Sequence, residues 1–208
     1  WRCRINPQKY GVCGMYQNQG GTLFNLNYGR VSSVAADPIE KKPLFHFFPG
    51  TLAFSLGTLG CNFHSKHCQN WEISMADSQT SSRSCREMSP EAQIKLAQQY
   101  DCQGVAWTYN EPAIWFEYTL DSARLAKENN LYTVYVTNGY ARPEALDTIG
   151  PWLDAWRVDV KGFADGFYRQ LAKIPHGQGI LDVTKRAKEK WHMHVEIVTN
   201  IIPTMNDD

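Results

Sequence analysis

The stretch GVAWTYNEPAIWFEYTLDSARLAKENNLYTVYVTNGY, residues 104–140, changes periodicity twice. Residues 104–109 and 132–137 are short runs of small, β-branched and aromatic side chains, which are typical of buried strands. Between them, residues 113–130 repeat apolar side chains at helical spacing, with Ile114, Tyr118 and Leu125 on one broad face. A strand, a helix and a second strand in this order predict two parallel strands joined by a right-handed crossover. The stretch therefore predicts an α/β fold.

The same alternation continues on both sides of this unit. Further strands are predicted at residues 51–57, 155–162 and 193–202, and further helices at 89–100, 142–153 and 179–191. The first of these helices opens with Ser89 as an N-cap and Pro90 at the first helical position. Five strands separated by helices predict a parallel sheet, either as an open doubly wound sheet or as a partial barrel. Both arrangements bind ligands at the carboxyl ends of the strands.

The chain length suits one domain with a small appendage, because 208 residues with 43% hydrophobic side chains can bury a substantial core. We expect residues 1–50 to form a cysteine-containing extension and residues 51–208 to form the core. The chain begins without methionine and stops soon after an apolar run. We therefore expect both parts to be incomplete, with the core truncated after its fifth strand.

Composition excludes several classes of partner. Lysine plus arginine equals aspartate plus glutamate at 21 each, so no basic field favours nucleic acid. No apolar run approaches the roughly 18 residues of a membrane span, and no signal peptide is visible. Six cysteines in this length are too sparse for a disulfide scaffold. These features predict a cytoplasmic protein without a nucleic-acid or membrane partner.

Polar side chains follow each predicted strand at its carboxyl end. Glu111 lies in TYNEP, Asn138 in TNGY, and Asp159 and Lys161 in DVK. Each has an ordinary structural explanation: an acid at a helix N-terminus, an Asn-Gly turn, and a structural ion pair. Because the carboxyl ends of parallel strands share one edge, their common placement predicts one composite active site.

The loop after the first strand of the core, GCNFHSKHCQNW at residues 60–71, supplies sulfur ligands. Cys61 and Cys68 occupy the outer positions of the spacing C-x3-C-x2-C, and Ser65 occupies the middle one. Three thiolates at this spacing hold a [4Fe–4S] cluster and leave one iron open, as in enzymes that use S-adenosylmethionine (SAM) to make radicals. Two other interpretations remain open: a pair of buried structural cysteines, and a zinc site that adds His64 and His67.

Several motifs, in order, resemble one family. They are CGMYQNQGGTLFNLNYGRVSSVAADPIEKKPLFHFFPGT, GCNFHSKHCQNWEIS, TYNEP, EYTLDSARLA, VTNGY, DVKGF and IIPTMND. Together they are similar to the radical SAM enzyme of the AmmeMemoRadiSam system, which is related to pyruvate formate-lyase activating enzyme. The resemblance covers residues 3–208 and implies a partial (β/α)6 barrel, TIM-like, that lacks its last unit here.

The resemblance also implies cofactors, partners and residue roles. A [4Fe–4S] cluster held by Cys61 and Cys68 would bind SAM, and an external one-electron reductant would drive cleavage to a 5′-deoxyadenosyl radical. That radical would abstract hydrogen from an unknown protein or small-molecule substrate, as a glycyl-radical activase does. The implied SAM-binding residues are His67 at the adenine, Glu111 at the amino group, and Asn138, Asp159 and Lys161 around the carboxylate and ribose.

Two positions depart from the family pattern. Val136 replaces an aspartate that often precedes TNG, which leaves any cation site built on that acid in question. Ser65 replaces the middle cluster cysteine, and a serine hydroxyl is a poor ligand for iron. The alternatives are a cluster-impaired, non-catalytic SAM-binding homologue, an engineered or erroneous residue, or rescue by another ligand. The candidate substitutes are His64, His67, Cys85 and Cys102.

A second cysteine pair, Cys3 and Cys13, resembles the end of a cysteine-rich segment that starts upstream in family members. It is either part of a metal site or two spare thiols.

Overall fold

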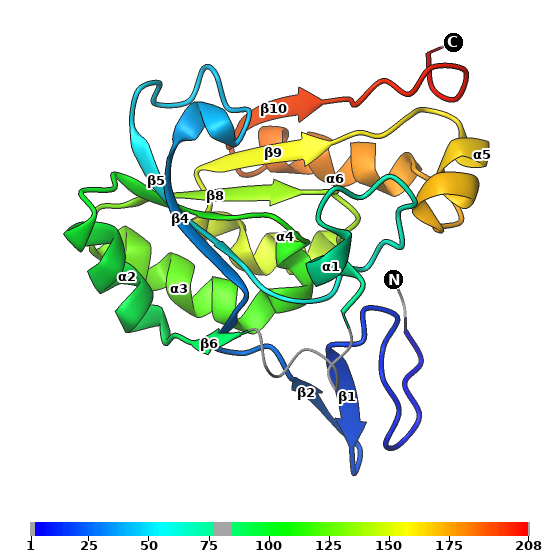
Figure 1. Ribbon diagram of the computed structural model, residues 1–208, viewed down its shortest axis with the longest axis horizontal. Helices are drawn as coiled ribbons and strands as arrows, with labels where there is room; N and C mark the ends of the chain where they lie inside the picture. The colour runs from blue at the N-terminus through cyan, green and yellow to red at the C-terminus, as the bar shows by residue number, and fades with distance from the viewer. Residues whose placement is uncertain (1–2, 77–84, 208) are drawn as a thin grey trace.

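The computed structural model describes residues 3–76 and 85–207, and its centre is one six-stranded sheet (Figure 1). The strand order is β10-β9-β8-β7-β5-β4, in which β4 alone runs antiparallel to its neighbour. The strands are β4 (Ser33–Pro38), β5 (Leu52–Gly57), β7 (Gly104–Trp107), β8 (Tyr132–Thr137), β9 (Ala155–Asp159) and β10 (His194–Val198). The predicted parallel α/β sheet is therefore confirmed.

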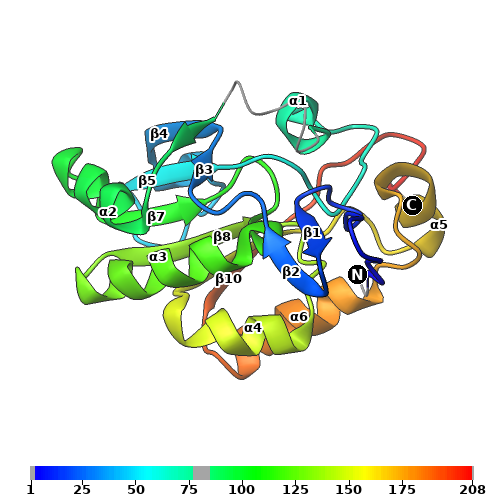
Figure 2. The ribbon, with the colours of Figure 1, turned by 90° about the horizontal axis from the view of Figure 1, so that it is seen from below.

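Four helices cover one face of this sheet (Figures 1 and 2). They are α2 (Pro90–Gln99), α3 (Phe116–Glu128), α4 (Pro143–Ile149) and α6 (Gln178–Glu189). The start of α2 follows the sequence prediction, because the Ser89 side chain accepts a hydrogen bond from the Ala92 N–H and Pro90 begins the helix. Apolar side chains from the helices meet one face of the strands in the main core, with Trp107 and Trp156 fully buried there.

The opposite, concave face of the sheet is covered by residues 39–48. Ile39, Leu44 and Phe47 pack on short inward side chains, among them Ala106 and Val134. The two edge strands, β4 and β10, do not pair with each other in the described part of the chain, so the sheet is open. This arrangement is consistent with the expected partial barrel.

The first fifty residues contact the core through strand pairs and a side-chain hydrogen bond. β1 (Tyr16–Gln19) and β2 (Thr22–Asn25) form a hairpin, and β3 (Arg30–Val31) pairs with β6 (Arg86–Glu87). β4, within the predicted extension, pairs with β5 along its whole length. The Trp115 indole N–H donates to the Asn27 carbonyl at 2.7 Å, which ties this segment to the start of α3.

Several predicted boundaries were too wide. β7 ends at Trp107 because Tyr109 adopts a positive φ of 71° and turns the chain. A 3-10 turn (Pro112–Trp115) precedes α3, and another (Gly150–Trp152) follows α4. After β9 the chain forms α5 (Asp165–Phe167) and a π-helical turn (Tyr168–Ala172), neither of which was predicted. A four-residue helix, α1 (Trp71–Ser74), follows the cysteine loop.

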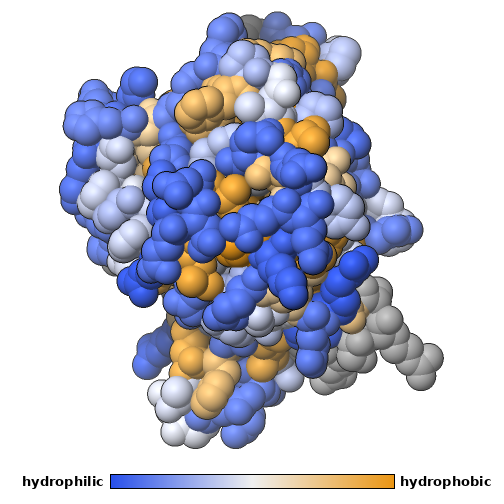
Figure 3. Space-filling model, turned by 90° about the vertical axis from the view of Figure 1, so that its left-hand side faces the viewer, coloured by the Kyte–Doolittle hydropathy of each residue, from blue (hydrophilic) through white to orange (hydrophobic). Residues whose placement is uncertain are grey.

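The amino ends of the parallel strands lie on the side of the molecule shown in Figure 3. That side presents mainly hydrophilic side chains, with apolar ones scattered between them. Within residues 3–76 and 85–207, no helix has the length and apolar character needed to cross a bilayer.

Candidate functional site

The predicted site residues converge at the carboxyl ends of the parallel strands. Asn138, after β8, links two of them: its backbone N–H donates to Glu111 Oε2 at 2.8 Å, and its side-chain amide lies 3.9 Å from Cys61 Sγ. Asp159, at the end of β9, lies 3.9 Å from the Lys161 ammonium. The sheet therefore brings four separate sequence motifs to one edge.

Glu111 is a fully buried carboxylate, with 1% of its surface exposed. It accepts hydrogen bonds from the Ala113 N–H at 2.9 Å, the Thr137 hydroxyl at 2.7 Å and the Asn138 N–H at 2.8 Å. Burial outweighs these donors and raises the pKa of Glu111 to about 7. A buried carboxylate with no cationic partner among the described residues suits a ligand that brings a positive charge.

The TNGY segment is held in place by side-chain packing and by a second asparagine. Gly139 has a φ of +71°, and a Cβ there would lie 2.8 Å from both Ile180 and Val158, so only glycine fits. The Asn138 amide donates to Asn62 Oδ1 at 2.7 Å, and the Asn62 amide donates to the Tyr140 carbonyl at 3.0 Å. Sequence analysis did not identify Asn62, because a polar residue beside a cysteine carries no pattern of its own.

The cysteine loop packs against the turn that follows α5. The His64 and Lys66 N–H groups donate to the carbonyls of Ala172 and Leu171 at 3.2 and 2.9 Å. Within the loop, the Phe63 N–H lies 3.4 Å from Cys61 Sγ. Burial, followed by the charge of Glu111, raises the pKa of the Cys61 thiol to about 12.

The loop does not provide three sulfur ligands. Ser65 is buried at the middle position, with 9% of its surface exposed, and its carbonyl accepts from the Cys68 N–H at 3.3 Å. Among residues 3–76 and 85–207, no group of three or more His, Cys, Asp or Glu side chains is arranged to hold a metal ion. The residues present therefore do not fit a cluster held by three thiolates, and the four-ligand zinc site is not formed.

The suggested substitute thiols, Cys85 and Cys102, lie in two different apolar clusters. Cys102 is buried in the helix-side core just before β7 begins, at the opposite end of the strands from the loop. Cys85 packs with Met15 and Leu59 in a small separate cluster that also includes Cys13. Cys3 and Cys13 lie near each other in the N-terminal segment, and burial raises the pKa of the Cys13 thiol.

His67 lies toward the β9 side of the site. Its Nδ1 atom is buried and has no hydrogen-bond partner in the described part of the chain. Its ring lies 6.2 Å from the ring of Phe167, and burial, assisted by the charge of Lys161, lowers the pKa of His67. A neutral imidazole with an unused buried nitrogen suits a polar aromatic ligand such as adenine.

Arg157 is a second residue that sequence analysis missed. Its Nη1 donates to Asp159 Oδ1 at 2.7 Å, so Asp159 is shared between Arg157 and Lys161. Strand alternation places Arg157, Asp159 and Lys161 in RVDVK on one side of β9, and that signal was present in the sequence.

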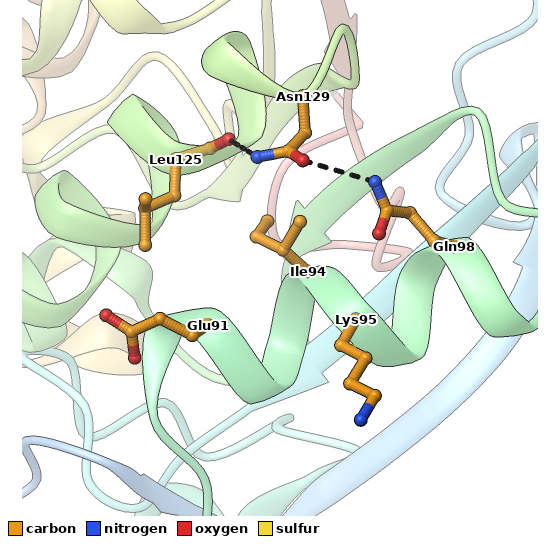
Figure 4. A pocket seen from close by; sticks show the side chains of 6 residues that line it. All are labelled: Glu91, Ile94, Lys95, Gln98, Leu125 and Asn129. Atoms are coloured by element: carbon orange, nitrogen blue, oxygen red, sulfur yellow. Dashed lines mark hydrogen bonds between the residues drawn. The ribbon is translucent and has the colours of Figure 1, made fainter.

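Two surface hollows lie away from this edge. One, of about 210 Å³, lies between α2 and α3 and is lined by Glu91, Ile94, Lys95, Gln98, Leu125 and Asn129 (Figure 4). Another, of about 370 Å³, lies beside α6 and β10. None of the predicted site residues lines either hollow, so they do not mark the site.

Comparison with known proteins agrees with the geometry. The family model described as Radical SAM superfamily matches residues 56–208. An uncharacterized protein of Methanocaldococcus jannaschii is 41% identical over 206 residues, which are 99% of this chain and 60% of that protein. The chain thus spans 60% of the length of this curated relative.

Two solved structures share the fold at low sequence identity. TYW1, solved with a lysine-pyruvate adduct bound, superposes with a TM-score of 0.56 at 15% identity, over 93% of this chain and 70% of that one. SuiB of Streptococcus suis has a TM-score of 0.50 at 11% identity, over 71% of this chain and 33% of that one.

Proposed function

This chain belongs to the radical SAM superfamily, and we propose that it binds SAM at the carboxyl ends of β5, β7, β8 and β9. The observation that carries the proposal is Glu111, a buried carboxylate joined to Cys61 through Asn138. An ammonium group placed against Glu111 would supply the missing positive charge and favour the ionised form of the carboxylate.

The remaining residues suit the other parts of SAM. We propose that His67 contacts adenine through its unpartnered Nδ1, and that Asn138, Asp159 and Lys161 contact the carboxylate and ribose. We also propose that residues 51–208 carry this site, while residues 1–50 form an extension whose strand β4 completes the sheet.

Superfamily membership supports SAM cleavage as the chemistry of the fold, with a [4Fe–4S] cluster as its usual companion. Cys61 and Cys68 are the proposed cluster ligands, but Ser65 leaves the set one thiolate short. We therefore propose that this chain binds SAM while holding a cluster poorly, and that Ser65 is the cause.

A second candidate is an active radical SAM enzyme of the AmmeMemoRadiSam type, related to pyruvate formate-lyase activating enzyme. The hydrogen bonds of Asn138 to Glu111 and Asn62 favour it, because the residues proposed to bind SAM remain linked to one another. Such an enzyme would take electrons from an external one-electron donor and act on a protein or small-molecule C–H bond in the cytoplasm. It predicts 5′-deoxyadenosine when the reconstituted protein is reduced in the presence of SAM.

Equilibrium dialysis with radiolabelled SAM tests the binding proposal without any need for a cluster. We expect saturable binding to the unsubstituted protein and weaker binding, by about tenfold or more, to Glu111→Gln, which loses a charged hydrogen bond. Glu128→Gln, an exposed change on α3, is the matched control and should bind like the unsubstituted protein. Equal binding by all three proteins would exclude Glu111 as the ammonium site.

A further inference from the structure

Arg157 is a buried guanidinium on the concave face of the sheet. Its strand neighbours Trp156 and Val158 pack on the helix side, whereas Ala155 packs on the concave side, so alternation turns Arg157 inward. Only 7% of its surface is exposed. Arginine is rarely buried to this degree unless its donors are matched by acceptors.

The described part of the chain matches only one of those donors. Nη1 donates to Asp159 Oδ1 at 2.7 Å, while Nε is buried without a hydrogen-bond partner. The nearest acid across the sheet is Glu196, which pairs with Arg157 in the β9–β10 register. Its carboxylate is already occupied, because it accepts from the Phe45 and His46 N–H groups at 3.0 and 2.9 Å.

The unused side of the guanidinium has a defined preference. With Nη1 engaged, the edge formed by Nε and Nη2 remains, and its two parallel N–H groups match the two oxygens of a carboxylate. A buried N–H left without an acceptor is costly, which favours a ligand that supplies one. The geometry therefore suits a carboxylate lying on the concave face, directly beside Asp159.

The polar groups on the opposite side of the concave face are paired with one another. There the Tyr109 ring lies over Gly57, where a Cβ would approach that ring to 3.0 Å. Its hydroxyl donates to Asp37 at 3.1 Å, and the Lys42 ammonium pairs with the same carboxylate at 2.7 Å. Both polar groups are thus satisfied by Asp37, and Arg157 is the concave-face cation with an unused buried donor.

We propose that Arg157 binds a carboxylate group of the substrate, on the concave face beneath the SAM site. This assignment rests on the proposed function, since it places the substrate next to SAM. It goes further by giving the substrate a chemical class: a small molecule or peptide that carries a carboxylate. Asp159 then joins the two sites, because it contacts both Arg157 and Lys161.

A direct test observes the Arg157 side chain by NMR in protein labelled with ¹⁵N-arginine. The Nε–Hε resonance of Arg157 is identified by its loss in Arg157→Lys. The probes are N-acetylglycine and pyruvate, with N-acetylglycinamide as the neutral match, each titrated with and without saturating SAM. We expect both carboxylates to shift this resonance in the presence of SAM, and the amide to leave it unchanged.

Affinity measurements on variants complete the test. Arg157→Gln should weaken N-acetylglycine binding by about tenfold or more. Arg157→Lys keeps the charge but loses the two parallel N–H groups, so its affinity should lie between those of the unsubstituted protein and the glutamine variant. Arg142→Gln removes a surface arginine that bonds an exposed glutamate and should have no effect. Circular dichroism of each variant checks folding. If the glutamine variant does not fold, the affinity of the lysine variant for N-acetylglycine provides the test instead.

Two results would overturn the proposal. If SAM alone shifts the resonance and abolishes the response to N-acetylglycine, Arg157 holds the carboxylate of SAM instead. If neither carboxylate shifts the resonance under any condition, Arg157 serves only to position Asp159. Failure of SAM binding itself is measured separately by dialysis, and the titrations without SAM still report on Arg157.

Discussion

Replacing Glu111 with glutamine should remove a cost to stability that grows with pH, although it also removes a carboxylate from the proposed site. Burial raises the pKa of Glu111 from 4.5 to about 7. At 1.36 kcal/mol for each pKa unit, the ionised form costs the folded protein about 3 kcal/mol above pH 7. Glutamine cannot ionise, so it avoids that cost. Because each oxygen of the carboxylate accepts a backbone N–H, the glutamine NH2 group must face one of these donors, and the variant also loses an acceptor to an extent that does not change with pH.

The direction in which stability changes with pH depends on which state of the chain holds the proton. Between pH 4.5 and about 7 the folded chain keeps the proton on Glu111, while the unfolded chain has released it. The free energy of unfolding therefore falls as pH rises through this window. The stability of the glutamine variant relative to that of the unsubstituted protein should therefore rise between pH 5 and pH 8, by up to about 3 kcal/mol.

Urea unfolding at pH 5, 6, 7 and 8, followed by tryptophan fluorescence, measures this difference. The exposed variant Glu128→Gln is the control and should show no comparable change with pH. A stability difference between Glu111→Gln and the unsubstituted protein that is the same at pH 5 and pH 8 would refute the reasoning. So would a stability of the glutamine variant, relative to the unsubstituted protein, that falls between pH 5 and pH 8.

The same titration should govern SAM binding. If the ionised form of Glu111 holds the amino group, its fraction rises from about 0.1 at pH 6 to about 0.5 at pH 7. The affinity for SAM should then rise about fivefold over this interval. Glu111→Gln should bind more weakly and without this rise, and a parallel rise in the variant would assign the pH dependence to another group.

Three further changes test contacts at the site and elsewhere in the fold. Asn138→Ala removes the amide that bonds Asn62 at 2.7 Å and should lower the free energy of unfolding, measured with urea, by about 1–2 kcal/mol. It should also weaken SAM binding in dialysis, and unchanged SAM binding would count against a contact between Asn138 and SAM. Gly104→Ala places a Cβ 2.0 Å from the Tyr132 ring and should cost about 1–3 kcal/mol in urea unfolding, and a neutral result would contradict the packing. Hydrogen bonds from Arg186 and then Lys190 lower the pKa of Asp147. Asp147→Asn should therefore reduce the melting temperature by more at pH 7 than at pH 3, because at pH 3 the unsubstituted protein also begins to lose the stability that this ion pair contributes. Equal reductions at both pH values would contradict the ion pair.

The main features of the sheet were predictable because they depend on local patterns. Alternating strand and helix periodicity determined the parallel order, and the capping residues Ser89 and Pro90 fixed the start of α2. Parallel strands bring their carboxyl ends to one edge, so the convergence of Glu111, Asn138 and Asp159 followed without any knowledge of side-chain positions.

Other features depend on contacts between distant segments and could not be predicted in the same way. The pairing of β4 with β5 and the cover formed by residues 39–48 arise from tertiary packing. The link between Asn62 and Asn138 spans 76 positions of the sequence and has no local signature. Arg157 is a partial exception, because alternation placed it beside Asp159, but its unpartnered Nε is visible only in the structure.

The central claim is that Ser65 limits a site that is otherwise arranged for SAM and a cluster. The most direct measurement is the iron and acid-labile sulfide content, with EPR after reduction, of this chain and of Ser65→Cys reconstituted side by side without oxygen. We expect about four iron and four sulfide atoms per chain, with a [4Fe–4S] signal, in Ser65→Cys and far less in the unsubstituted protein. Equal cluster content in the two proteins would contradict the claim.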